Sequence, residues 1–206
     1  MASPTQFIQP VRRSEDIANI DTILSWAIRC QTRLDRVTPE VTLFKLDEWV
    51  AAPVLPSLFT DPQSCSRLRD AILNRGYQRL YGTLLEKQLL PDCLYRVPVT
   101  CEALEEFYDF VGMFLSVLLS GNDAESKPDW ILFSLEGEYY IVAGSYDFVQ
   151  DVLGCTLDQA FLNFEHYIQN LSSGSVSNES TQYFKEIFDQ LRKYETAEFG
   201  EEFRLS

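Results

Sequence analysis

Residues 130–143, WILFSLEGEYYIVA, constrain the fold of this chain more strongly than any other part of the sequence. Two runs of β-branched and aromatic residues flank Glu136 and Gly137, a pattern typical of a β-hairpin. The second run is almost continuously apolar, so we expect both faces of the hairpin to be partly covered. The chain must therefore contain an antiparallel sheet and other elements that pack against it.

Helical patterns account for most of the remaining sequence. The strongest begins at Thr100, a helix-capping residue, and is apolar on nearly every side as far as Leu119. Such a helix is buried on most sides, and Phe114 is expected to lie in its core. We therefore predict an α+β fold: a mainly helical single domain in which a small antiparallel hairpin or sheet at residues 130–143 packs on a central buried helix at residues 100–119.

Proline, glycine and capping residues predict the bounds of the other elements. They indicate helices at residues 14–34, 62–90, 145–153, 156–171 and 184–194, the second with a break at residues 74–76. Residues 93–99 fit a short extended segment, whereas residues 41–50 fit either a strand or a helix. We predict a loose N-terminal arm at residues 1–13, one globular domain at residues 14–198 and a frayed tail at residues 199–206.

Negative charge is concentrated in the second half of the chain. The net charge is −14, but residues 1–100 carry 12 basic and 11 acidic side chains, whereas residues 101–206 carry 5 basic and 20 acidic ones. Direct nucleic-acid binding needs cations that neutralise phosphates, so this balance predicts no such binding. An acidic half that is rich in aromatic rings suits a basic protein partner, although negative charge also serves solubility alone.

We find no apolar segment of targeting or membrane-spanning length. The longest nearly unbroken apolar run, residues 110–119, is far shorter than the roughly 20 residues that a membrane span requires. Residues 1–13 do not resemble a signal peptide, and the five cysteines lie at irregular spacing, which favours reduced, mostly buried thiols. We therefore expect a cytoplasmic protein without a membrane span and without disulfides.

The common motifs of catalysis, nucleotide binding and metal binding do not occur in the sequence. It lacks the glycine-rich phosphate-binding patterns and the G-x-S-x-G nucleophile motif. His166 is the single histidine, and the cysteines and carboxylates show no ligand spacing. We therefore expect a protein that is not an enzyme and that has neither a metal nor a cofactor.

Rings and acids gather where the hairpin is followed by a helix. A partner-binding surface is expected there, made of Tyr139, Tyr140, Tyr146, Asp147 and Asp151. The alternative interpretation is that the tyrosines pack in the core and that the acids only face solvent.

Arg75 and Arg79 form a second candidate site. They lie four residues apart in a predicted helix, a spacing at which two guanidinium groups can clamp an anion. The alternative is that they pair with acids of the second half and stabilise the domain.

These patterns favour a protein that binds a basic protein partner, as an assembly factor, adaptor or regulator. A competing hypothesis is a small-ligand sensor or an enzyme, with its pocket between the hairpin and the central helix. A third hypothesis is an acidic inhibitor, or immunity-type protein, that blocks a basic protein.

Overall fold

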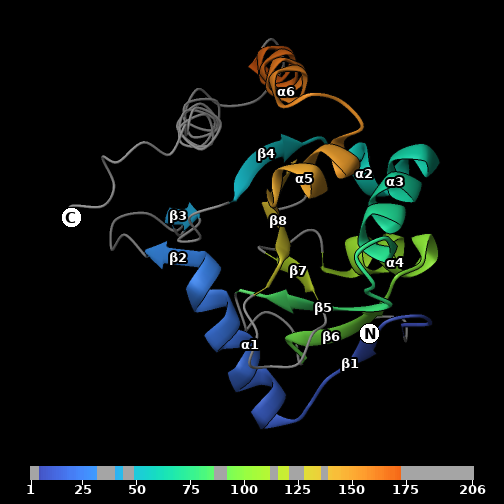
Figure 1. The fold of residues 1–206 in the computed structure, drawn as a ribbon. Helices are drawn as coiled ribbons and strands as arrows, with labels where there is room; N and C mark the ends of the chain where they lie inside the picture. Colours follow the sequence, from blue (N-terminus) through green and yellow to red (C-terminus); the bar gives the residue numbers. More distant parts are fainter. Residues whose placement is uncertain are drawn as a thin grey trace.

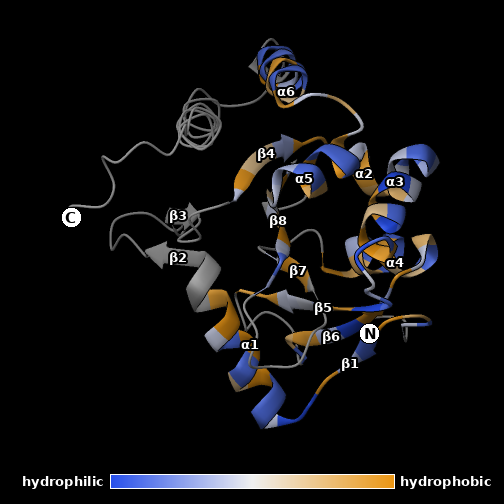
Figure 2. Ribbon diagram, in the orientation of Figure 1, coloured by the Kyte–Doolittle hydropathy of each residue, from blue (hydrophilic) through white to orange (hydrophobic). Residues whose placement is uncertain are grey.

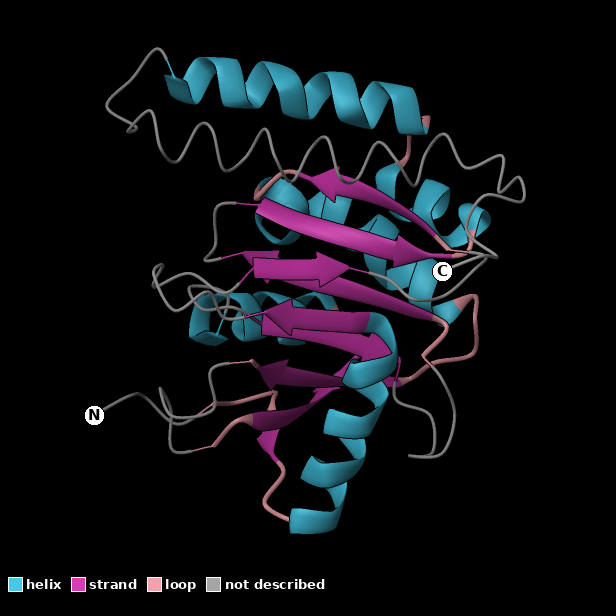
Figure 3. Cartoon of the chain, turned by 90° about the vertical axis from the view of Figure 1, so that its left-hand side faces the viewer, coloured by secondary structure: helices cyan, strands magenta, loops and turns pink. Residues whose placement is uncertain are grey.

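An α+β fold is formed by the residues that the computed structural model describes, which are 5–31, 40–43, 49–85, 92–111, 116–120, 128–135 and 139–172. Within them lie six helices, a seven-stranded antiparallel sheet and a separate two-stranded ribbon (Figure 1). Figure 3 shows the strands of the large sheet side by side, with helices on both faces.

The large sheet has the strand order β1-β6-β5-β7-β8-β9-β4. In that order its strands are Gln9–Pro10, Leu94–Pro98, Arg79–Leu84, Ser116–Ser120, Trp130–Leu135, Tyr139–Gly144 and Val50–Val54. The ribbon pairs β2 (Ile28–Gln31) with β3 (Glu40–Leu43). The helices are α1 (Ser14–Ala27), α2 (Ser57–Thr60), α3 (Pro62–Leu73), α4 (Cys101–Val111), α5 (Tyr146–Leu153) and α6 (Leu157–Ser172).

Alternation along the strands divides the core into two layers. In β8, Trp130 and Leu132 face one layer, whereas Ile131 and Phe133 face the other, as the two-residue period of a strand requires. Helices α2 to α5 supply the first layer, and α1 with most of α6 supplies the second. Figure 2 shows α3, α4 and α6 striped in blue and orange, the pattern of helices that bury one side.

The sheet is larger than the sequence analysis predicts. The prediction of a mainly helical domain with a small hairpin is wrong, because strands lie where helices were expected. The predicted central helix at residues 100–119 ends at Val111, and β7 follows it. Val117 and Leu118 face opposite layers of the core. The run is therefore apolar on every side because it is a central strand with both faces covered, rather than a buried helix. Phe114 lies outside the described residues.

A second predicted helix also divides into a helix and a strand. α3 ends at Leu73, and Gly76, with a φ of +84°, leads the chain into β5. The break predicted at residues 74–76 is the place where the apolar pattern changes from the helical period to the strand period. In the same way, the helix predicted at residues 14–34 ends at Ala27, and residues 40–43 form a strand.

The hairpin and several helix ends are confirmed. β8 and β9 are antiparallel neighbours. Asp61 caps α3 by accepting a hydrogen bond from the Ser64 amide (2.8 Å), and Ser145 caps α5. Gly154 ends α5 in the left-handed conformation, with a φ of +64°. Thr156 caps α6, so the chemistry of caps located these ends correctly.

The segment predicted as a loose arm contains the edge strand β1, which pairs with β6. Ile8 and Val11 flank this strand and are buried. The division into arm, domain and tail stays a prediction, and the helix predicted at residues 184–194 lies outside the described residues. No helix in the described part of the chain is long and apolar enough to cross a membrane.

Candidate interaction groove on helix α4

Helix α4 buries one side and directs acids from the other. The Thr100 hydroxyl accepts a hydrogen bond from the Ala103 amide (3.2 Å) and caps the start of the helix. The buried side consists of Ala103, Leu104, Phe107 and Val111, and the opposite side carries Glu102, Glu105, Glu106 and Asp109. Both sets recur at intervals of three and four residues, the helical period, so the acids lie along one side of α4.

The buried side of α4 packs closely on the sheet. Phe107 lies over Gly82 of β5, where an added Cβ atom would overlap the phenyl ring. Glycine is needed at this position because of the close approach of the helix to the strand. The sheet therefore gives the acidic side of α4 a firm support.

Glu106 binds the N-terminal segment to α4. Its carboxylate accepts hydrogen bonds from the backbone amides of Gln6, Phe7 (2.7 Å) and Ile8 (2.8 Å). Partial burial raises the pKa of Glu106, but the three hydrogen bonds lower it further, so the pKa lies below its usual value. The ionised form of Glu106 is therefore the form that holds residues 6–8 beside the helix.

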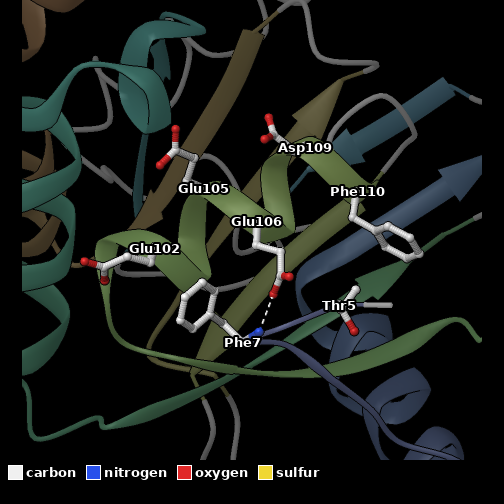
Figure 4. A pocket seen from close by; sticks show the side chains of 7 residues that line it. All are labelled: Thr5, Phe7, Glu102, Glu105, Glu106, Asp109 and Phe110. Atoms are coloured by element: carbon white, nitrogen blue, oxygen red, sulfur yellow. Dashed lines mark hydrogen bonds between the residues drawn. The ribbon is translucent and has the colours of Figure 1, made fainter. Parts of the chain in front are cut away.

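An open groove of about 430 Å³ lies between the N-terminal segment and α4 (Figure 4). It is lined by Thr5, Phe7, Glu102, Glu105, Glu106, Asp109 and Phe110, and we call it the α4 groove. Figure 4 shows Glu106 directed at the backbone of Phe7, while Glu105 and Asp109 extend from the far side of the helix. Phe7 is 39% exposed, so the groove presents a large apolar side chain to solvent.

Three acids of the α4 groove form no ion pair within the described part of the chain. Glu102, Glu105 and Asp109 are exposed, and no basic side chain within the described ranges forms an ion pair with them. Some acids elsewhere are paired, as Asp92 is with Arg12 at 2.8 Å, whereas exposed acids such as Asp158 and Glu165 form no ion pair in the described part of the chain either. Like charges along one helix side repel one another, and a cation placed among them relieves that repulsion.

The predicted partner-binding residues do not form one exposed surface. Tyr140 is only 2% exposed, because it faces the layer of the core under α4. Asp151 is exposed but lies 3.1 Å from the Arg75 guanidinium. Tyr146 and Asp147 are exposed on the first turn of α5, and the side chain of Tyr139 lies outside the described residues. Binding of a partner by these five residues stays a prediction, with Tyr146 and Asp147 as its most accessible members.

The two arginines of the predicted anion clamp do not share a helix. Arg75 follows α3, whereas Arg79 is the first residue of β5, so the expected spacing on one helical face is wrong. Arg75 donates to the Ala71 carbonyl (2.9 Å) and to Asp151, and its guanidinium lies 4.8 Å from the centre of the Phe148 ring. Arg75 therefore follows the alternative interpretation, that of pairing inside the domain.

The α4 groove was missed by the sequence analysis, although half of its signal is present in the sequence. Acids spaced three and four residues apart in a predicted helix indicate one charged side. The other half, the placement of Phe7 beside this side, joins residues about a hundred positions apart and has no local pattern.

Comparison with protein-family models, with curated proteins and with solved structures finds no match for this chain. Its site is therefore interpreted from geometry and chemistry alone. Among the described residues, no group of three or more His, Cys, Asp or Glu side chains is arranged to hold a metal ion.

Proposed function

We propose that this protein is a non-enzymatic interaction module whose α4 groove binds a basic segment of a protein partner. The observation that carries the proposal is the set of exposed acids that form no ion pair among the described residues, placed beside exposed aromatic surface in an open groove. Charge and aromatic content predict the same class of partner from the sequence, a basic protein. The α4 groove is, however, a different surface from the one that the sequence predicts.

Charge and shape favour the same kind of ligand. Arginine and lysine pair an aliphatic stem with a cationic head, so the stem can pack on Phe7 or Phe110 while the head meets the acids. Unpaired acids also attract a cationic partner over a distance and raise its association rate. We infer an arginine- or lysine-containing segment as the occupant, because its side chains match both the acids and the rings of the groove.

The proposal is tested with a short arginine-rich peptide as the probe. In the test variant Glu105→Gln/Asp109→Asn, two acids of the groove lose their charge. The matched control, Asp158→Asn/Glu165→Gln, removes the same charge from exposed positions of α6. At about 0.2–1 kcal/mol per exposed charge pair, the test variant should bind roughly two- to thirtyfold more weakly, measured by titration calorimetry. An equal loss in the control would mean that only the overall charge matters, and would overturn the proposed site.

The surface of α5 is tested in the same assay. Tyr146→Ala removes an exposed ring that is remote in sequence from the groove, and Asp147→Asn removes the adjacent charge. Weaker peptide binding in these variants, with unchanged binding in the groove variant, would show that the peptide binds at the surface predicted from the sequence and not in the α4 groove.

An acidic inhibitor is the second candidate, because it uses the same unpaired acids. The two proposals differ in what happens to the partner after binding. An adaptor leaves the partner active, whereas an inhibitor abolishes its activity in proportion to the bound fraction. Measurement of the activity of an identified partner at saturating protein separates them.

A further inference from the structure

Three neighbouring strands place hydroxyl groups in one row across the sheet. Ser116 of β7 pairs with Ser134 of β8, and Ser134 pairs with Tyr140 of β9. Residues that are directly opposite on antiparallel strands direct their side chains to the same face. All three are buried, in the layer of the core that α2 and α4 cover.

The row of hydroxyls borders a small cavity beneath α4. Its volume is about 10 Å³, and its other walls are Phe59, Phe107, Tyr108, Leu118 and Leu132. The serines are small residues at positions where the adjacent residues of the same layer are large, such as Leu118 and Leu132, and this difference leaves the space. The cavity lies between α4 and the hairpin, where the ligand pocket of the competing hypothesis was expected, but it is far too small for a metabolite.

Two of the hydroxyls make no hydrogen bond of normal geometry in the described part of the protein, although the side chains of Ser134 and Tyr108 lie close to the Tyr140 hydroxyl. Ser116 Oγ and the Tyr140 hydroxyl are fully buried, in residues that are 1% and 2% exposed. A buried hydroxyl without a partner destabilises the folded protein, so native proteins rarely leave two of them beside the same cavity.

We infer that this cavity is a binding site for a single water molecule that bridges Ser116 and Tyr140. A cavity holds a water when it offers roughly 10–15 Å³ of accessible volume and several polar partners, and both conditions are met here. The lining consists of hydroxyls and apolar atoms without a charged group, so a neutral molecule with both donors and acceptors fits it and an ion does not.

The chemistry of Tyr140 agrees with this assignment. Burial raises the pKa of the Tyr140 hydroxyl, so the phenol remains protonated and keeps both its donor and its acceptor capacity. A bridging water then joins β7 to β9 across the intervening strand, directly under the helix that carries the α4 groove.

The site is tested by oxygen-17 relaxation dispersion, which counts water molecules that stay bound beyond nanoseconds, and by water-selective nuclear Overhauser spectra. The parent protein should show cross-peaks from one long-lived water to Ser116 and Tyr140. Tyr140→Phe should lose these cross-peaks and lower the count by one. Ser116→Ala should do the same, and it keeps the test informative if the tyrosine variant does not fold.

Tyr95→Phe is the matched control, because Tyr95 is equally buried but its hydroxyl donates to the Asp92 carbonyl (2.9 Å), outside the cavity. It should keep the count and the cross-peaks of the parent. The inference is overturned if the parent shows no long-lived water near Tyr140, or if Tyr140→Phe and Tyr95→Phe give the same spectra.

Discussion

The three hydrogen bonds of Glu106 make a sharp prediction about Glu106→Gln. Glutamine offers one acceptor oxygen where the carboxylate offers two, and its amino group cannot accept the remaining amide protons. We expect the variant to release the amides of residues 6–8 from α4, while the rest of the fold stays intact.

The size of the effect follows from where these amides lie. A hydrogen bond to a charged acceptor contributes about 1.5–3 kcal/mol when it is buried. Gln6 and Phe7 are exposed, so water replaces much of what the carboxylate supplies, and only Ile8 is buried. After this discount for solvent, Glu106→Gln should lower the free energy of unfolding by about 1–2 kcal/mol.

The pKa of Glu106 gives the effect a pH dependence. Its pKa is lower in the folded protein than the 4.5 of an unperturbed side chain, so its contribution to stability is complete above that value. The contribution is lost as the pH falls through the depressed pKa, because the protonated group accepts the amide bonds poorly. The difference in unfolding free energy between the parent and Glu106→Gln should therefore be constant near neutral pH and should shrink below about pH 4.5.

The assay combines urea unfolding across this pH range with hydrogen exchange of the backbone amides. Glu105→Gln is the matched control, since it removes an adjacent exposed charge that holds no amide. The reasoning is refuted if the amides of residues 6–8 exchange equally fast in the parent and in Glu106→Gln, or if Glu105→Gln has the same effect.

Three further predictions follow from single contacts. Gly82→Ala should lower the free energy of unfolding by about 1–3 kcal/mol, measured by urea unfolding, because the added methyl group overlaps Phe107. At Gly76 the space is open, so Gly76→Ala should destabilise the protein only through the positive φ of its backbone. Burial raises the pKa of Cys65 to about 12, so this thiol should resist iodoacetamide at pH 8 in the folded protein and react after unfolding, as mass analysis can show. Asp151→Asn should change the free energy of unfolding by less than about 1 kcal/mol, because its ion pair with Arg75 is exposed, and a larger loss would mean that the pair is screened from solvent.

Local chemistry explains which elements the sequence predicts correctly. Asp61, Ser145, Gly154 and Thr156 mark helix ends because each acts on amides or carbonyls a few residues away. The hairpin is equally local, since its two strands follow each other along the chain. Such features need no knowledge of the tertiary structure.

The central strands could not be predicted in this way. A short run such as β7 is apolar on all sides whether it is a buried helix or a strand covered on both faces, and only its neighbours β5 and β8 decide. The exposure of the predicted partner-binding residues depends on tertiary neighbours in the same way. Tyr140 faces a layer that α2 and α4 cover, whereas Tyr146 and Asp147 are exposed on α5, and no pattern local to residues 139–151 distinguishes the two positions.

The position of Glu106 also bears on how the α4 groove binds. The walls of the groove come from segments about a hundred residues apart, and Glu106 fixes one to the other before any partner arrives. A partner therefore loses no entropy in ordering Phe7, and this preorganisation contributes to affinity without adding a contact.

Glu106→Gln and Glu102→Gln each remove one charge, but only the first also frees the wall that carries Phe7. Affinity for the arginine-rich peptide should fall further in Glu106→Gln than in Glu102→Gln. This difference in affinity loss should persist when the salt is raised from about 50 to about 200 mM, because screening weakens charge pairs and leaves packing unchanged. Equal losses in the two variants at both salt concentrations would show that Glu106 acts on the partner only as a charge.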